Sequence, residues 1–207
     1  MSPSAPPHRL YTIGHGALEL EAFIQLLVEN GVAAIADVRS SPYSRYSPQF
    51  NREPLKAALL ARRIQYVFLG EELGARRDEE ECYLGDVASY ELIAKTPAFE
   101  RGIDRLRKGL QSQPISLMCA EKDPLTCHRT ILICRHLKSE GEIVHILGPG
   151  ELETQEIAES RLLKLVGLPN RDLFRSKAEL LEEAYMRQGA EIAYRRDSVG
   201  AAPDKGN

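Results

Sequence analysis

The chain has no hydrophobic run that approaches the roughly 18 residues of a membrane-spanning helix. Its opening stretch, MSPSAPPHRL, also lacks the apolar segment of a secretory signal peptide. We therefore expect a cytoplasmic protein without a membrane partner. Its four cysteines are then expected to be reduced thiols rather than disulfides.

The sequence also lacks an excess of positive charge, a Walker loop and a GxGxxG motif. The formal net charge of −3 does not indicate nucleic-acid binding, although a local basic patch would still permit it. The missing phosphate-binding loops argue against a standard nucleotide-binding fold. With 207 residues, 43% of them hydrophobic, and no internal repeat, the chain is long enough for one domain with a buried core.

Short apolar runs alternate with amphipathic segments along the chain. Strands are predicted near residues 9–14, 34–38, 65–69, 115–119 and 143–147. Helices are predicted over residues 18–30, 55–63, 99–111, 126–139, 153–166 and 172–188. This alternation is typical of βαβ crossovers. The predicted fold class is therefore α/β, a three-layer sandwich with a mainly parallel five-stranded sheet and helices on both faces.

The chain divides into one domain and two polar ends. A single α/β domain is expected over residues 9–194. Residues 1–8 are rich in Pro and Ser and are expected to be disordered, and a polar tail at 195–207 is expected to fray. Residues 71–97 form a long acidic and irregular stretch, and such segments are often lids or binding loops.

Ionisable residues follow four of the predicted strands. His15 follows the first strand, Asp37 and Arg39 the second, the Glu71–Glu72 pair the third, and Cys119 the fourth. Ligands of open parallel sheets bind beyond the carboxyl ends of the strands, so one pocket is expected there. The candidate catalytic residues are Cys119, Glu121, His15, Asp37 and Cys127. The candidate anion-binding residues are Arg39, Ser44, Arg45, His128 and Arg129.

The segment MCAEKDPLTCHR, residues 118–129, carries the most specific chemistry. Cys127 is expected at a helix N-terminus, where the dipole and Arg129 would stabilise a thiolate. Cys119 follows the apolar run ISLM, so burial should raise the pKa of its thiol. The structural alternatives are that Cys119 is a small core residue, and that Asp37 and Arg39 pair internally at a turn.

Two chemical hypotheses use these residues differently. In the first, the protein binds or processes a phosphorylated small molecule, nucleotide or nucleic-acid end, with Arg39, Arg45 and Arg129 holding the anion. In the second, Cys119 and Cys127 carry out thiol chemistry, either rhodanese-like or redox. We favour the first hypothesis, and the sequence leaves open whether the protein is an enzyme.

Two further hypotheses rank lower. Metal binding by His15, Cys119, Cys127 and His128 is placed last, because the spacing matches no standard zinc module and a Cys-His dipeptide rarely gives both ligands to one ion. No metal ligand is therefore assigned, and no cofactor is named. A pure interaction module is the remaining alternative, and the concentration of ionisable groups argues mildly against it.

Five features of the sequence together resemble the family known as domain of unknown function 488. They are TIGHG (12–16), DVRSSPYSR (37–45), Phe50, IQYVFLGEELG (64–74) and MCAEKDPLTCHR (118–129). The family usually has Ser at the position of Gly16 and often a second Gly at the position of Ala75. The resemblance, over roughly residues 10–148, implies an α/β fold with the motif residues in one pocket and implies no reaction.

A weaker resemblance is to rhodanese-type domains. Those domains also have Asp-x-Arg after a strand and a strand–Cys–loop–Arg–helix unit. Their loop is shorter and contains Gly, whereas here Arg129 lies ten positions after Cys119 and the loop between them is acidic. Generic α/β architecture accounts for this likeness equally well.

Overall fold

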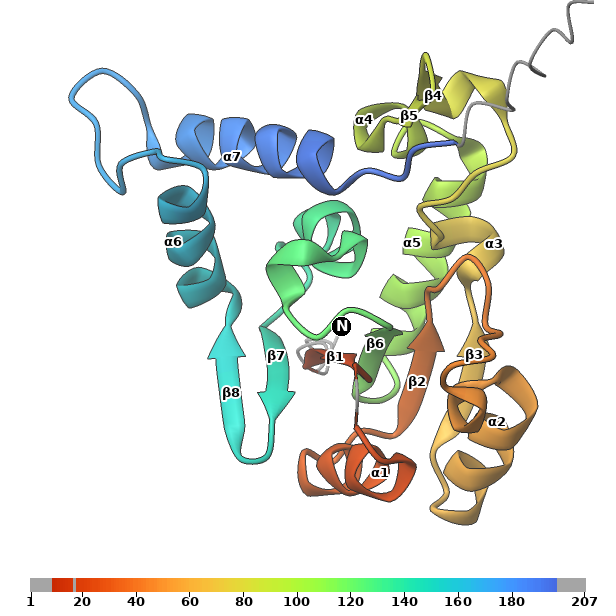
Figure 1. Ribbon diagram of the computed structural model, residues 1–207. Helices are drawn as coiled ribbons and strands as arrows, with labels where there is room; N and C mark the ends of the chain where they lie inside the picture. The colour runs from red at the N-terminus through yellow and green to blue at the C-terminus, as the bar shows by residue number, and fades with distance from the viewer. Residues whose placement is uncertain (1–8, 17, 197–207) are drawn as a thin grey trace, which may run out of the picture.

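The computed structural model describes residues 9–16 and 18–196 (Figure 1). The expected disordered segment 1–8 lies outside the described residues, as does the polar tail beyond Arg196. Among the described residues, none of the helices combines the length and the apolar character needed to cross a bilayer.

A six-stranded sheet forms the centre of the fold, in the order β3-β2-β6-β1-β7-β8. The strands are β1 (Leu10–Gly14), β2 (Ala34–Asp37), β3 (Gln65–Phe68), β6 (Ile115–Cys119), β7 (Ile143–Gly148) and β8 (Glu151–Thr154). The five predicted strands are all present and pair in parallel. β1 and β6 are buried along their whole length, as expected for strands covered on both faces.

The sixth strand, β8, was not predicted. It pairs antiparallel with β7 across a short turn and lies at the edge of the sheet, where only Glu153 of its residues is buried. An edge strand with so little buried surface has no apolar alternation to reveal it. The helix predicted from residue 153 therefore begins later, as α6 (Gln155–Leu165), with the Thr154 hydroxyl accepting from the amide of Ile157.

Helices cover both faces of the sheet, which confirms the predicted three-layer α/β class. α1 (Leu20–Glu29) and α2 (Arg52–Ala61) pack on one face. α5 (Pro97–Leu110) and α6 lie on the other side, and α7 (Lys177–Ile192) packs on α6 and on the segment that follows β6 (Figure 1). In β6, the side chains of Leu117 and Cys119 belong to the core of the second face, and Met118 to that of the first.

The helix predicted over 126–139 is not a continuous α-helix. Its residues form a π-helical turn at Arg129–Ile133 and a 3₁₀ turn at Cys134–His136. Cys127 precedes this turn in an extended conformation. The expected dipole of a long helix therefore does not act on Cys127. Short π-helical turns occur often at functional sites, and this one follows the residues with the most specific chemistry.

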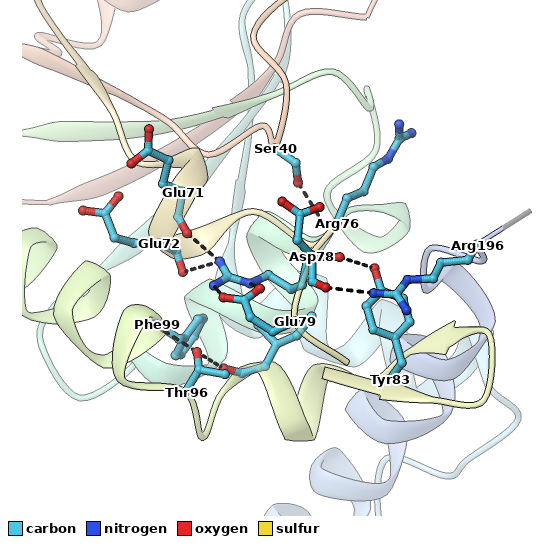
Figure 2. Close-up of polar contacts among 12 residues, drawn as sticks. Ser40, Glu71, Glu72, Arg76, Asp78, Glu79, Tyr83, Thr96, Phe99 and Arg196 are labelled. Carbon is cyan, nitrogen blue, oxygen red and sulfur yellow. Dashed lines mark hydrogen bonds and ion pairs between the residues drawn. The ribbon is translucent and has the colours of Figure 1, made fainter. Parts of the chain in front are cut away.

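The irregular stretch 71–97 folds against the end of the sheet. It contains α3 (Gly70–Leu73), the hairpin of β4 (Tyr83–Leu84) and β5 (Val87–Ala88), and α4 (Tyr90–Ile93). Arg77, which is 7% exposed, holds this stretch together. Its guanidinium donates to the Glu71 carbonyl at 2.5 Å and to the Glu79 carboxylate at 2.5 and 3.1 Å (Figure 2).

The chain end after α7 returns to this hairpin. Arg195 forms a bridge with Val87, and the Arg196 guanidinium lies 3.7 Å from the centre of the Tyr83 ring. Arg196 also donates to the Asp78 carbonyl at 3.1 Å (Figure 2). The expectation that the tail frays from residue 195 is wrong for these two residues, because the β4–β5 hairpin supplies their partners.

The order of the strands creates a crevice at the carboxyl end of β6. The connections that leave its neighbours β1 and β2 pass through α1 and α2 on one face, whereas the segment after β6 packs on the opposite face. Connections that diverge in this way leave a hollow between the strand ends. Cys119, the last residue of β6, lies at this point opposite Gly14 of β1.

A chain of buried polar groups links the sheet to the helices beside it. His145 of β7 accepts from the Thr12 hydroxyl at 2.8 Å through Nδ1 and donates to the Gln155 side-chain oxygen at 3.0 Å through Nε2. The Gln155 amide donates to the hydroxyl of Tyr185, which donates in turn to Glu159. Because the pKa of His145 is lowered, its imidazole is neutral, and with Nε2 donating to Gln155 the Nδ1 atom accepts from Thr12.

We predict that His145 makes the protein less stable in acid. Burial and the charges of Arg129 and Arg161 lower the pKa of His145 from 6.5 to about 4, against weaker opposite effects of the Gln155 hydrogen bond and of Asp123. The unfolded chain therefore binds the proton first, and stability is lost as pH falls from 6.5 towards 4. The loss attributable to His145 should be about 3 kcal/mol.

Urea unfolding of the wild type and His145→Gln across this pH range tests the prediction. The variant should be less stable at pH 7 and should lose less stability on acidification. His136→Gln is the control, because the His136 side chain is exposed and its pKa, which burial also lowers, falls less far than that of His145. Equal pH dependence of the wild type and His145→Gln would refute the assignment.

Candidate functional site

A hollow of about 580 Å³ opens at the carboxyl ends of β1, β2 and β6. This is within the range of small-molecule pockets, roughly 300–1,000 Å³. The predicted site residues that line it are His15, Arg39, Ser44, Cys119, Glu121 and His128. These side chains come from segments that lie more than a hundred residues apart in the sequence, and the hollow brings them together.

The other predicted site residues do not line the hollow. Asp37, Cys127 and Arg129 are buried behind its wall. Arg45 is exposed on the loop after β2, and its guanidinium lies 5.1 Å from the centre of the Tyr46 ring. Arg45 is therefore not part of this pocket in the described structure.

Asp37 and Arg39 form a buried ion pair at the end of β2. The guanidinium donates to the two carboxylate oxygens at 2.9 and 2.6 Å, and also to the Phe50 carbonyl at 2.9 Å. The Tyr66 hydroxyl donates to Asp37 at 2.7 Å. Burial alone would lower the pKa of Arg39, but its bonds to Asp37 outweigh burial and the pKa is raised. Asp37 thus positions a charged Arg39 at the pocket wall.

His15 lies flat against Phe50 on the same wall. The two ring centres are 4.3 Å apart and the rings are inclined by 15°. Nδ1 is 3.2 Å from the Gly16 carbonyl, which can only accept, so Nδ1 carries the proton and Nε2 is left as an acceptor. Burial and the charge of Arg39 lower the pKa of His15, which favours this neutral form.

The loop after β6 is held by a close backbone contact and by Arg129. A Cβ atom on Gly14 would lie 1.8 Å from the Glu121 carbonyl oxygen, so this approach requires glycine. The Arg129 guanidinium donates to the carbonyls of Glu121 at 2.7 Å and Lys122 at 3.0 Å, and to the Thr12 hydroxyl at 3.4 Å. Arg129 is 1% exposed and therefore shapes the loop instead of facing a ligand.

Cys119, Cys127 and His128 meet at the base of the hollow. The His128 Nε2 atom donates to the Val38 carbonyl at 2.9 Å, which directs Nδ1 towards the two sulfur atoms. Nδ1 is 3.8 Å from the sulfur of Cys119 and 3.9 Å from that of Cys127. The Cys127 thiol also lies 3.1 Å from the Glu121 carboxylate.

The two thiols of this cluster differ in acidity. Burial would raise the pKa of Cys127, but a hydrogen bond from Cys119 and the charges of Arg129 and His128 lower it well below its usual value. The bond to Cys127 and burial raise the pKa of Cys119. The two shifts run in the predicted directions. The cause is side-chain charge rather than a helix dipole, and Cys119 is the cysteine that lines the pocket.

Sequence reasoning missed several residues that line the pocket, chief among them Arg76. Its backbone amide donates to the Ser40 hydroxyl at 2.9 Å, and its side chain extends away from the Arg77 network (Figure 2). A basic pair inside the acidic stretch 71–97 was the signal that could have identified it. Tyr90 and Tyr194 also line the pocket, and Tyr194 lies beyond the helix predicted to end at 188.

One family model matches the chain. It is described as domain of unknown function DUF488, and the match covers residues 19–135, which is more than half of the chain. No curated protein and no solved structure matches. The matched region contains the Asp37–Arg39 pair, Arg76 and the whole Cys119–His128 segment, whereas His15 precedes it. The weaker rhodanese resemblance has no counterpart in these comparisons.

We predict that Asp37→Asn destabilises the protein by about 3–5 kcal/mol, because Arg39 would lose its counter-charge in a buried site. Tyr66→Phe is the matched control, since it removes one hydrogen bond to the same carboxylate and should cost about 1–2 kcal/mol. Urea unfolding at pH 7 measures both effects. Similar small losses in the two variants would show that the ion pair does not hold this wall.

Proposed function

This chain is a member of the DUF488 family, and from its pocket we propose that it binds and processes a phosphorylated small molecule of nucleotide size. The observation that carries the proposal is Arg76, an exposed arginine beside several serine hydroxyls at the rim of a hollow of about 580 Å³. Guanidinium and hydroxyl groups together are suited to a phosphate. A nucleotide or a nucleic-acid end would present the same chemistry.

The arginine that is best suited to a ligand is not one of those first expected. Arg39 and Arg129 donate several of their N–H groups to protein acceptors. Arg76 instead has its guanidinium 4.9 Å from the centre of the Tyr194 ring, and no ion pair within the described residues occupies it. Its charge is therefore available to an anion at the pocket rim.

Two other residues of the pocket lining support proton transfer. Glu121 and the neutral His15 both line the pocket, and a carboxylate and an imidazole are the commonest groups for general acid–base chemistry. Asp37 fits this role poorly, because both of its oxygens accept from neighbouring side chains. We therefore assign proton transfer to Glu121 or His15.

Aromatic side chains favour a ligand with a ring. Tyr43, Tyr90 and Tyr194 line the pocket, and Tyr43, which is 57% exposed, offers a stacking surface to a base or another flat group. A cytoplasmic location is part of the proposal. The four cysteines are free in the structure, as they would be in a reducing compartment.

Thiol chemistry is the second candidate, and one observation favours it. The pKa of Cys127 is lowered while its neighbour Cys119 lines the pocket, which is the combination of thiolate and access that a thiol pair would need. This candidate requires Cys119 for activity and does not require Arg76. The two candidates therefore respond differently to the same set of variants.

We predict that Arg76→Ala weakens binding of phosphorylated ligands at least tenfold, since a lost charge-assisted contact costs about 1.5–3 kcal/mol. Calorimetric titration with nucleotides, sugar phosphates and inorganic phosphate measures the change. Arg45→Ala is the matched control, because Arg45 is an exposed arginine outside the pocket lining.

Cys119→Ser should bind these ligands within about threefold of the wild type if the anion is held at the rim. Equal affinity of Arg76→Ala and wild type, or binding lost only in Cys119→Ser, would overturn the proposal in favour of thiol chemistry.

A further inference from the structure

We propose that Cys119, Cys127 and His128 bind a zinc ion at the base of the pocket. Their two sulfur atoms and the free imidazole nitrogen all lie within 4.8 Å of one another, and all three residues are buried. Thiolate and imidazole are the ligands zinc prefers in proteins. The site does not depend on the nature of the phosphorylated ligand.

The distances within the cluster match the edges of a zinc tetrahedron. With Zn–S bonds of about 2.3 Å and Zn–N bonds of about 2.0–2.1 Å, sulfur and nitrogen in a tetrahedral site are about 3.6 Å apart. The observed separations from His128 Nδ1 are 3.8 Å to Cys119 and 3.9 Å to Cys127. Movements of a few tenths of an ångström would therefore complete the coordination.

The imidazole is already oriented as a ligand. Because the Val38 carbonyl can only accept, the 2.9 Å contact fixes a proton of His128 on Nε2 and directs Nδ1 towards the sulfurs. Burial would lower the pKa of His128, but its bond to Cys127 raises it, so a metal would replace the proton on Nδ1. A metal-binding histidine almost always donates its second nitrogen to a carbonyl or carboxylate in this way. Val38 lies at the end of β2, so the orientation comes from the sheet itself.

The sulfur atoms have the surroundings of metal thiolates. The Arg129 amide donates to the Cys127 sulfur at 3.5 Å, and the buried Arg129 side chain closes the loop that separates the two cysteines. Binding would expel the protons that the two cysteines and the Nδ1 atom of His128 share, and two thiolates would then balance the charge of the ion. The carboxylate of Glu121, now 3.1 Å from Cys127, would be freed from that thiol.

The fourth coordination position would open into the pocket. Cys119, His128 and Glu121 all line the hollow, and three protein ligands with one open position are typical of catalytic rather than structural zinc. A water at this position would lie beside Glu121, which could accept its proton. Zinc would thus supply a Lewis acid to the same pocket that Arg76 lines.

Two other cysteines provide matched controls. Cys82 and Cys134 are also free and buried, but neither belongs to a group of metal-compatible side chains within the described residues. Oxidation of Cys119 and Cys127 to a disulfide is the competing fate of the cluster. A reducing agent in every sample separates that outcome from metal binding.

The test is metal binding by the purified full chain after treatment with a chelator. We expect one zinc per chain by elemental analysis, and a rise in melting temperature on adding Zn²⁺ to the wild type. Co²⁺ should give the sulfur-to-cobalt absorption of a thiolate site together with the intense visible bands of tetrahedral cobalt. Cys119→Ser, Cys127→Ser and His128→Gln should each bind zinc at least about 100-fold more weakly.

Cys82→Ala, Cys134→Ala and His136→Gln should retain wild-type stoichiometry. Circular dichroism identifies any variant that fails to fold, and the wild-type melting shift does not rely on variants. The proposal is overturned if the reduced wild type takes up no zinc. It is also overturned if cobalt absorption persists in Cys119→Ser, or if a control variant loses the metal. Arg76→Ala should still bind zinc, so this proposal and the phosphate proposal can fail separately.

Discussion

The site depends on the hydrogen bonds that the buried guanidinium of Arg129 donates. It ties the Thr12 hydroxyl of β1 to the carbonyls of Glu121 and Lys122 in the loop after β6. No carboxylate forms an ion pair with it among the described residues, although an uncompensated buried charge costs several kcal/mol. Carbonyl dipoles offset part of that cost, and the negative charges of Cys127 and Glu121 offset a further part. The charge that shapes the loop therefore also favours an ionised sulfur beside it.

The same residue connects the pocket to the remainder of the core. Thr12 accepts from Arg129 and donates to His145, which continues the polar chain to Gln155 and to Tyr185 of α7. A change at Arg129 would thus disturb both the loop and the packing of α6 and α7. The base of the pocket is formed by residues that are hydrogen-bonded to the core, whereas its rim is not. Arg76 belongs to that rim.

The sequence predicted which residues lie at the pocket where a local rule applies. It did not predict the role of a residue that depends on how its side chain is buried. The strand-end rule identified His15, Cys119 and Glu121, because each follows an apolar run that can be read directly. It could not show that Arg39 is paired with Asp37. An arginine that binds a ligand and one that supports a wall have the same local sequence. Only the packing of Phe50 and Tyr66 around the pair separates the two cases.

Long-range placement limited the prediction in the same way. Tyr194 reaches the pocket because α7 crosses the molecule and its end meets the β4–β5 hairpin (Figure 1). No residue spacing in the sequence indicates that the end of α7 contacts this hairpin. Metal binding was placed last because the spacing matches no standard zinc module and a Cys-His dipeptide rarely gives both ligands to one ion. Here Cys127 is extended and His128 caps the π-helical turn, so the two side chains converge on Cys119.

Charge balance links the proposed metal to the proposed ligand. A zinc ion with two thiolates is neutral, and the positive charge of Arg129 is then matched by the carboxylate of Glu121. The base of the pocket would carry no net charge to repel or attract a phosphate, and Arg76 at the rim would fix where the anion lies. Without the metal, the Cys127 thiolate and Glu121 would face Arg129 and His128, whose pKa is raised despite burial by its bond to Cys127, so these charges would also balance. The metal would therefore change the reactivity of the pocket without changing its charge.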